Sequence, residues 1–174
     1  MEKQLTLFSS SQEPSVARIE FWNIRIDGAA RGNPGPAGAG VVLQRPGMPP
    51  VNGAIYLGNK TNNQAEYIAL AYALHLAHFY REQEAQNVDI KLVIYSDSQL
   101  LVRQMNKEYR VKNESLALIK KNIDALLLGW SYAFVHVMRE NNKAADALAN
   151  EAIDKKKKIP TDFLKFLADC GLVH

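Results

Sequence analysis

The sequence predicts an α/β fold in which helices flank a mixed five-stranded sheet. Three strand-like segments follow one another at the start, and two further ones then alternate with helical segments. Consecutive strands joined by tight turns favour an antiparallel meander, whereas strands separated by helices favour parallel additions to the same sheet. With 174 residues, 47% of them hydrophobic, the chain is long enough to form the core that such a sheet requires.

The first three strands are predicted from residue composition and turn chemistry. The segment 19–26, IEFWNIRI, alternates along its length and is rich in β-branched and aromatic residues. Asp27-Gly28 and the Asn-Pro-Gly-Pro run at 33–36 are typical of turns, so we expect this strand to end at Ile26 in a tight loop. Two more strands are expected, one from residue 39 and one over 51–58, with 45–50 as the hairpin connection.

Helical periodicity begins after residue 60. The segment 61–84 repeats small and apolar residues at helical spacing, and Thr61 or Asn62 can cap it. The segment 88–99, VDIKLVIYSDSQ, is typical of a continuous apolar strand that is buried on both faces. The remaining expected elements are helices over about 99–106 and 113–128, a strand over 130–138 and an Ala-rich helix over 142–158.

Both termini differ from this alternating pattern. Residues 1–17 are expected to form a flexible tail before a domain over 18–157. Residues 158–174 are expected to form a short helix that begins at Thr161, and docking of this helix on the chain's own domain is favoured over its binding to a partner.

Cys170 is the one cysteine, so neither an intrachain disulfide nor a Cys-based zinc cluster is possible.

Composition excludes several classes of protein. No stretch approaches 18 consecutive apolar residues, and the beginning of the chain lacks the features of a signal peptide, so we expect a cytoplasmic protein with no membrane association. The net charge is only +3, but six of the residues between 101 and 121 are Lys or Arg and two are Glu. This local excess fits either a nucleic-acid-binding surface or a solvated helix face. We expect a monomer.

Four carboxylates lie in four different predicted elements: Asp27, Glu66, Asp97 and Asp146. Individually they could be a turn residue, a first-turn anion, a helix cap and a solvated helix position. However, Glu66 shares a helical face with small and apolar residues, and Asp146 does the same in the last helix, so both point toward the sheet. Buried like charges repel unless a cation joins them, and oxygen ligands favour Mg²⁺ or Mn²⁺ over zinc.

Four motifs, IDGAARGNPGPAGAG, TNNQAEYIAL, YSDSQLLV and NKAADALANEA, together resemble the type 1 ribonuclease H family over about residues 18–157. The resemblance implies an RNase H-like fold and a catalytic domain that hydrolyses the RNA strand of RNA/DNA hybrids with two Mg²⁺ ions, for which Mn²⁺ can substitute. The products would carry 5′-phosphate and 3′-hydroxyl ends, and primers or R-loops would be the substrates. Carried over motif by motif, the metal-binding and catalytic acids are Asp27, Glu66, Asp97 and Asp146, and the substrate contacts are Gly28, Asn33, Asn62, Asn63 and Gln99.

Two departures from the family pattern affect these expectations. Many members carry a loop His shortly before the last acid, and Arg139 is the nearest replacement here. An Arg stays protonated, so we expect it to assist catalysis by holding phosphate or product rather than as a base. His136 is expected to be a packed strand residue. The chain also lacks the inserted basic handle helix, which predicts weaker hybrid affinity.

The pentad QLTLF at residues 4–8 resembles the short peptide by which bacterial replication and repair proteins attach to the sliding clamp. Gln4, Leu5, Leu7 and Phe8 would make the contacts. Alternatively, the apolar side chains fold back onto the sheet or fray. Two other functions remain open: a hybrid-binding protein without catalysis, and a relaxed nuclease that also cuts double-stranded RNA.

Overall fold

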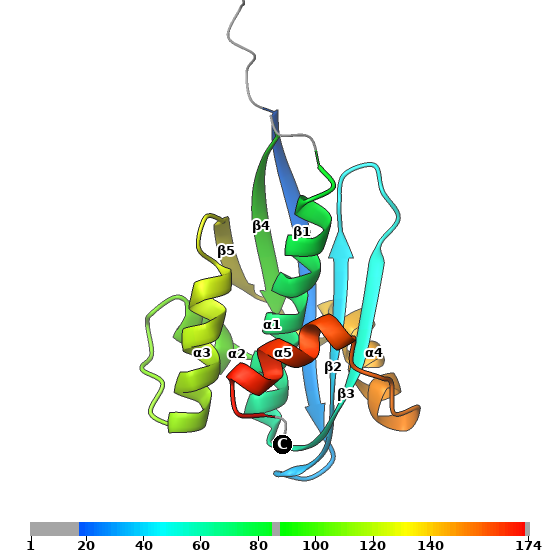
Figure 1. Cartoon of the computed structure of the whole chain (residues 1–174), viewed down its shortest axis with the longest axis vertical. Helices are drawn as coiled ribbons and strands as arrows, with labels where there is room; N and C mark the ends of the chain where they lie inside the picture. Colours follow the sequence, from blue (N-terminus) through cyan, green and yellow to red (C-terminus); the bar gives the residue numbers. More distant parts are fainter. Residues whose placement is uncertain (1–17, 85–87, 173–174) are drawn as a thin grey trace, which may run out of the picture.

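The computed structural model describes residues 18–84 and 88–172. Its centre is a five-stranded sheet in the order β3-β2-β1-β4-β5 (Figure 1). The β1–β2 and β2–β3 pairs are antiparallel, while β1–β4 and β4–β5 are parallel, as the alternation of elements predicts. The strands are β1 (Arg18–Ala30), β2 (Gly35–Gln44), β3 (Val51–Lys60), β4 (Val88–Ser96) and β5 (Ser131–His136).

Helices cover both faces of this sheet. The long helix α1 packs on β1 and β2, α3 packs on α1, and α2 contacts β4 and β5. The helix α4 packs on β1, β2 and β3. The bounds are α1 (Asn62–Arg81), α2 (Gln99–Met105), α3 (Glu114–Leu126), a short 3₁₀ helix η1 (Arg139–Asn141), α4 (Lys143–Asp154) and α5 (Thr161–Asp169). None of the helices in the described part of the chain has the length and apolar character of a membrane-spanning segment.

Two glycines let helices approach the sheet closely, on opposite faces. A Cβ atom on Gly40 of β2 would lie 2.2 Å from the carbonyl oxygen of Ala145 in α4. A Cβ atom on Gly28 of β1 would lie 2.1 Å from the backbone nitrogen of Glu66 in α1. Larger residues at these positions would push the helices away. The glycines therefore set the depth at which the acidic helix residues meet β1.

Two predictions about the strands were wrong. First, β1 does not end at Ile26 but continues through Asp27 to Ala30, because its last residues still pair with β2, up to Ala30 with Ala37. Asp27 therefore lies within a strand rather than in a turn. Second, β4 is not buried on both faces, because α4 packs over β1, β2 and β3 instead. Its alternate residues are only half-buried: Lys91, Val93 and Tyr95.

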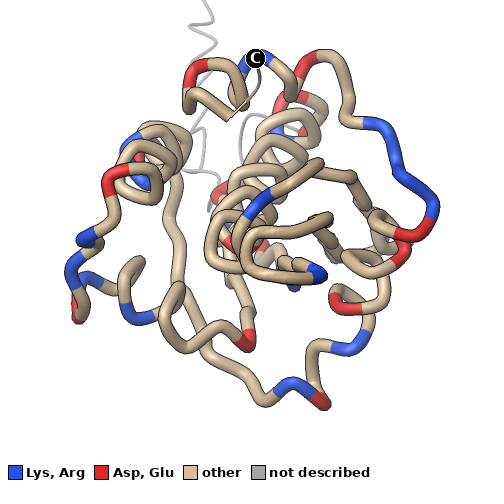
Figure 2. The backbone as a smooth tube through the Cα atoms, turned by 90° about the horizontal axis from the view of Figure 1, so that it is seen from below, with Lys and Arg blue, Asp and Glu red and all other residues tan. Residues whose placement is uncertain are grey.

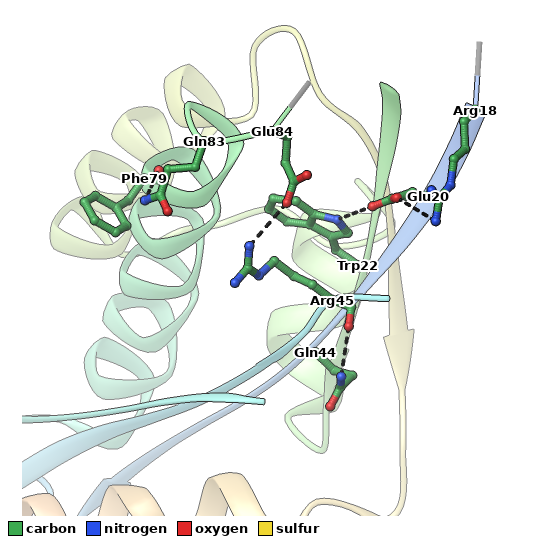
Figure 3. A network of polar contacts seen from close by, with 8 residues as sticks. All are labelled: Arg18, Glu20, Trp22, Gln44, Arg45, Phe79, Gln83 and Glu84. Atoms are coloured by element: carbon green, nitrogen blue, oxygen red, sulfur yellow. Dashed lines mark hydrogen bonds and ion pairs between the residues drawn. The ribbon is translucent and has the colours of Figure 1, made fainter. Parts of the chain in front are cut away.

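The hairpin at 45–50 is held by a buried arginine at the end of the sheet where β2 leads into it (Figures 1 and 3). Arg45 is 7% exposed and donates from Nη1 to Oε1 of Glu84, 3.2 Å away. Its guanidinium carbon lies 4.1 Å from the ring centroid of Tyr80 and 5.7 Å from that of Trp22. An ion pair combined with aromatic stacking offsets the cost of burying the charge.

The C-terminal helix α5 lies against α1, as the sequence predicts. The side chain of Phe163 is fully buried, with its ring centroid 5.1 Å from that of Tyr72. Nε2 of His75 in α1 lies 2.7 Å from Oδ2 of Asp162. Cys170 is buried, and burial raises the pKa of its thiol to about 11. The C-terminal segment thus contributes apolar surface to the core of the described structure.

Candidate active site

Three carboxylates from three elements meet where β1 and β4 end. Asp27 lies near the end of β1, Glu66 in the second turn of α1, and Asp97 directly after β4. One carboxylate oxygen of each lies within 4.8 Å of the others. Because β1 and β4 are parallel neighbours, their carboxyl ends fall at the same edge of the sheet, and the close approach of α1 at Gly28 brings Glu66 to that edge. Figure 2 views the backbone from this end of the molecule.

These acids form part of an open cavity of about 440 Å³. Asp146, from the first turn of α4, also lines it, but its Oδ1 accepts a 2.9 Å hydrogen bond from Nη2 of Arg139. The structure therefore brings all four predicted acids and Arg139 to one cavity. The full lining is Asp27, Gly28, Ala29, Ala30, Asn62, Glu66, Asp97, Ser98, Arg139, Asp146 and Asn150.

Burial and mutual repulsion dominate the electrostatics of this cavity. Burial raises the pKa of Asp27 to about 7, and the negative charges of Asp97 and Asp146 add to the effect. Burial also raises the pKa of Glu66 well above its usual value, and Asp27 and Asp97 raise it further. A backbone hydrogen bond from Gly28 and the charge of Arg139 act in the opposite direction on Glu66. In the metal-free protein, these groups therefore hold protons more tightly than ordinary carboxyls.

The donor set fits a divalent cation. Oε2 of Glu66 is buried and has no hydrogen-bond partner among the described residues. A buried acceptor without a partner is unfavourable, and several carboxylates facing one another repel. A hard cation with oxygen ligands removes both penalties at once. The acidic cluster of Asp27, Glu66 and Asp97 thus has the composition and geometry of a divalent metal site.

The predicted substrate contacts are only partly gathered at the cavity. Gly28 and Asn62 line it, and Oδ1 of Asn33 accepts a 3.0 Å hydrogen bond from the backbone N–H of Asn62. This bond ties the loop after β1 to the start of α1. Asn63 and Gln99 are exposed and are not among the lining residues. The predicted partner-binding residues Gln4, Leu5, Leu7 and Phe8 lie outside the described residues.

Several residues near the acids were missed or misjudged from the sequence. Ser98, not Asp97, is the N-cap of α2, and its side chain accepts from the backbone N–H of Leu101. His136 is exposed rather than packed, because it ends the edge strand β5, and its Nε2 lies 3.3 Å from the carbonyl oxygen of Asp97. Asn142 is fully buried beside the acids. Its position before a helix suggests only a cap, so sequence alone gives no sign of this placement.

Comparisons with known proteins agree with this geometry. A family described as reverse transcriptase-like matches residues 25–152. The chain is 38% identical to ribonuclease HI of Halobacterium salinarum over 74% of its own length, and 31% identical to ribonuclease H of Dechloromonas aromatica over 79%. It spans 62% of the first relative, 97% of the second, and 35% of the bifunctional protein Rv2228c of Mycobacterium tuberculosis.

Solved structures show the same fold. The chain superposes with a TM-score of 0.72 on LC11-RNase H1, a compost metagenome protein crystallised in complex with an RNA/DNA hybrid. The two are 40% identical over 78% of this chain and 98% of that one. The RNase H1 of Halobacterium salinarum superposes with a TM-score of 0.70 at 36% identity, over 78% of this chain and 98% of that one. From its motifs, strand order, acidic cluster and similarity to these proteins, the chain belongs to the type 1 ribonuclease H family.

Proposed function

We propose that this chain is an endonuclease that hydrolyses the RNA strand of RNA/DNA hybrids. The observation that carries the proposal is the convergence of Asp27, Glu66 and Asp97 within 4.8 Å, with Asp146 lining the same cavity. The membership of the family adds to it, as does the crystallisation of one relative with an RNA/DNA hybrid. Primers and R-loops in the cytoplasm are the proposed physiological substrates, and a monomer is the proposed working form.

The four acids would hold the metal ions of the reaction. Two Mg²⁺ ions, or Mn²⁺ as an alternative with the same ligand preference, would supply activation of water and stabilisation of the leaving 3′ oxygen. Asp27, Glu66 and Asp97 are already gathered for this task. Asp146 would join them as a ligand, because its Oδ1 accepts the guanidinium bond of Arg139 and the carboxylate keeps further lone pairs for a cation. The RNA products would carry 5′-phosphate and 3′-hydroxyl ends.

The proposed substrate contacts would select RNA through its 2′-hydroxyl, which both donates and accepts hydrogen bonds. Side-chain amides are suited to this group because each offers a donor and an acceptor without a charge. Exposed amides stand at and around the cavity, which supports this assignment. The proposed contacts are Gly28, Asn33, Asn62, Asn63 and Gln99.

Arg139 is proposed to handle phosphate or product in place of the family's loop His. Its side chain is 78% exposed, so it can move between Asp146 and a phosphate with little loss of packing. The hydrogen bond and charge of Asp146 raise the pKa of its guanidinium, which therefore stays protonated. Proton abstraction by Arg139 is thus excluded, and a phosphate or product contact is the role that its charge supports.

A cleavage assay tests the proposal against its alternatives. Matched RNA/DNA, RNA/RNA and DNA/DNA duplexes would be incubated with Mg²⁺, Mn²⁺ or a chelator. We expect cleavage of the RNA strand of the hybrid alone, and none with chelator. Binding of the hybrid without cleavage in either metal would indicate a silent hybrid-binding protein. Equal cleavage of RNA/RNA would indicate a relaxed nuclease.

The N-terminal pentad is proposed to bind a bacterial sliding clamp, which would raise the local concentration of the enzyme at primers. Its support is the QLTLF sequence itself and the nine residues between Phe8 and the start of β1 at Arg18, a spacer of about 30 Å when extended. The test is binding of the purified protein to a sliding clamp before and after the double change Leu7→Ala/Phe8→Ala. Absence of binding by the unchanged protein would end the idea. Loss of cleavage off the clamp would instead place the pentad in the folded domain.

A further inference from the structure

Asn142 lies at the junction of three elements that carry the acids. Its side chain is fully buried, and its Nδ2 donates two hydrogen bonds. One, 2.8 Å long, goes to the carbonyl oxygen of Ile26, the residue before Asp27 in β1. The other, 3.1 Å long, goes to Oδ1 of Asp97 at the end of β4. Asn142 itself immediately precedes α4, which carries Asp146.

Helix capping does not explain this residue. Asn142 occupies the N-cap position of α4, but its side chain makes no capping hydrogen bond. Elsewhere in the chain, Asn113 at the start of α3 does cap, because its Oδ1 accepts from the backbone N–H of Leu116 at 3.0 Å. An asparagine before a helix normally accepts such a bond. The side chain of Asn142 instead donates hydrogen bonds to the backbone of β1 and to the carboxylate of Asp97.

The backbone of Asn142 extends the same junction. Its N–H donates to the carbonyl oxygen of Arg139 at 3.0 Å, and its carbonyl oxygen accepts from the N–H of Asp146 at 3.1 Å. One residue thus connects β1 and Asp97 by its side chain, and Arg139 and Asp146 by its backbone. Its Oδ1 is buried without a hydrogen-bond partner among the described residues. A buried acceptor left unpaired costs free energy, so the burial of this oxygen is locally unfavourable.

We propose that Asn142 is a positioning residue for the metal-binding acids, an inference that rests on the proposed function. Asp27 and Glu66 repel the carboxylate of Asp97, and the amide N–H holds its Oδ1 in place against this repulsion. The amide is neutral, so it orients the carboxylate without supplying the positive charge that would compete with a metal ion. The bond to Ile26 fixes the start of α4 against β1, and so sets the distance of Asp146 from Asp27.

The experiment compares Asn142→Ala and Asn142→Leu, which is close to Asn in size, with the unchanged protein. Leu fills a similar space but has no N–H to donate and adds no charge to the cluster. Mn²⁺ binding would be measured by titration calorimetry without nucleic acid, and kcat and KM would be measured on an RNA/DNA hybrid. We expect both variants to lose about 10- to 100-fold in Mn²⁺ affinity or in kcat, as is typical when a partner of a metal ligand is removed. The KM for the hybrid should stay close to its original value.

The matched control is Asn113→Ala, which removes an asparagine that caps a helix outside the site. It should lower the melting temperature without changing Mn²⁺ affinity or kcat. If Asn142→Ala behaves in the same way, its role is structural and the proposal is overturned. Wild-type values in Asn142→Leu would show that shape rather than donation matters, which also overturns it. Should Asn142→Ala fail to fold, Asn142→Leu and Asn142→Ser provide the comparison, with activity normalised to the folded fraction.

The same measurements distinguish a failure of the nuclease proposal from a failure of the Asn142 proposal. If the unchanged protein binds Mn²⁺ but does not cleave the hybrid, the nuclease proposal fails, and the Mn²⁺ affinities of the variants still decide the role of Asn142. If the unchanged protein binds no Mn²⁺, both proposals are overturned.

Discussion

Two buried charge clusters lie at opposite ends of the same sheet, and they are built in opposite ways. At the hairpin end, the guanidinium of Arg45 lies against the rings of Trp22 and Tyr80. It donates to Glu84, as Figure 3 shows. At the other end, Asp27, Glu66 and Asp97 converge without a cation among them. The positive charge of Arg139 reaches this cluster only through an exposed side chain that pairs with Asp146.

The comparison of the two clusters indicates different roles: the charge of Arg45 is buried to stabilise the fold, whereas the three carboxylates are buried to bind a ligand. The guanidinium at the hairpin end already has an ion-pair partner and two aromatic rings against it, although its buried Nε has no hydrogen-bond partner among the described residues. The carboxylates instead raise one another's pKa, and Glu66 keeps an unpaired buried oxygen. Stability is reduced locally in a way that protonation or a bound cation reverses. Functional sites are where such departures from local stability are expected.

The largest predicted effect is at the acidic end. Asp97→Asn should lower kcat on an RNA/DNA hybrid by about 1,000-fold or more, equivalent to ~4 kcal/mol, because it removes a metal-binding charge from the cluster. The melting temperature should not fall, since one of the repelling charges is lost. Glu84→Gln is the matched control at the hairpin end and should leave kcat unchanged. Wild-type turnover in purified Asp97→Asn would contradict the metal-site assignment.

The second prediction concerns stability at the hairpin end. Arg45→Ala removes a buried cation and its packing against two aromatic rings, and should lower the free energy of unfolding by about 2–4 kcal/mol. Glu84 is 28% exposed, so Glu84→Gln should cost less, about 1 kcal/mol. Urea denaturation measures both. An Arg45→Ala protein as stable as the original would show that the ion pair and stacking contribute nothing. Activity of the folded variant should be retained.

The sequence predicted that the acids would face the sheet, because the motifs and the order of strands and helices both restrict where these side chains can lie. The period of α1 placed Glu66 on its buried face, and the parallel pairing of β1 with β4 explains why Asp27 and Asp97 meet. Strand ends were less predictable. Turn-type residues after Ile26 suggested a loop, whereas pairing with β2 extends β1 to Ala30.

The residues around the acids depend on contacts between distant segments, which local patterns do not encode. Asn142 and Ile26 are 116 residues apart in the chain, and the motif NKAADALANEA, which begins at Asn142, does not show that this side chain reaches Ile26 and Asp97. The same holds for Arg45 and Glu84, which only the packing of the hairpin on α1 brings together. The division into a tail, a catalytic domain and a C-terminal helix stays a prediction.

A third prediction uses the pH dependence of the acidic cluster. The folded-state pKa of Asp27 is about 7, raised by burial from 3.8. The stability that this carboxyl contributes is therefore complete below about pH 4 and is lost as the pH rises through 7. Without metal at pH 8, Asp27→Asn should be more stable than the original protein by up to about 4 kcal/mol, whereas at pH 4 the difference should nearly vanish.

Thermal or urea unfolding in EDTA at both pH values measures this difference. Addition of Mg²⁺ at pH 8 should stabilise the original protein and not Asp27→Asn. The original protein should then be at least as stable as Asp27→Asn. The equivalent change at the hairpin end, Glu84→Gln, should show no gain in stability at pH 8. If Asp27→Asn were less stable than the original protein in EDTA at pH 8, the repulsion inferred from the cluster would be absent.

The smallest effect is expected at Arg139, a cation that touches the acidic end through an exposed bond to Asp146. Its pair with Asp146 has side chains 78% and 30% exposed, so Arg139→Ala should change stability by less than about 1 kcal/mol. Turnover on the hybrid should fall by about 3- to 10-fold if the guanidinium holds phosphate or product, and Arg139→Lys should recover part of it. Arg45 at the hairpin end provides the contrast, because its loss lowers stability and spares turnover. Full turnover in Arg139→Ala would show that the cation next to Asp146 is dispensable, and that the missing loop His has no replacement at this position.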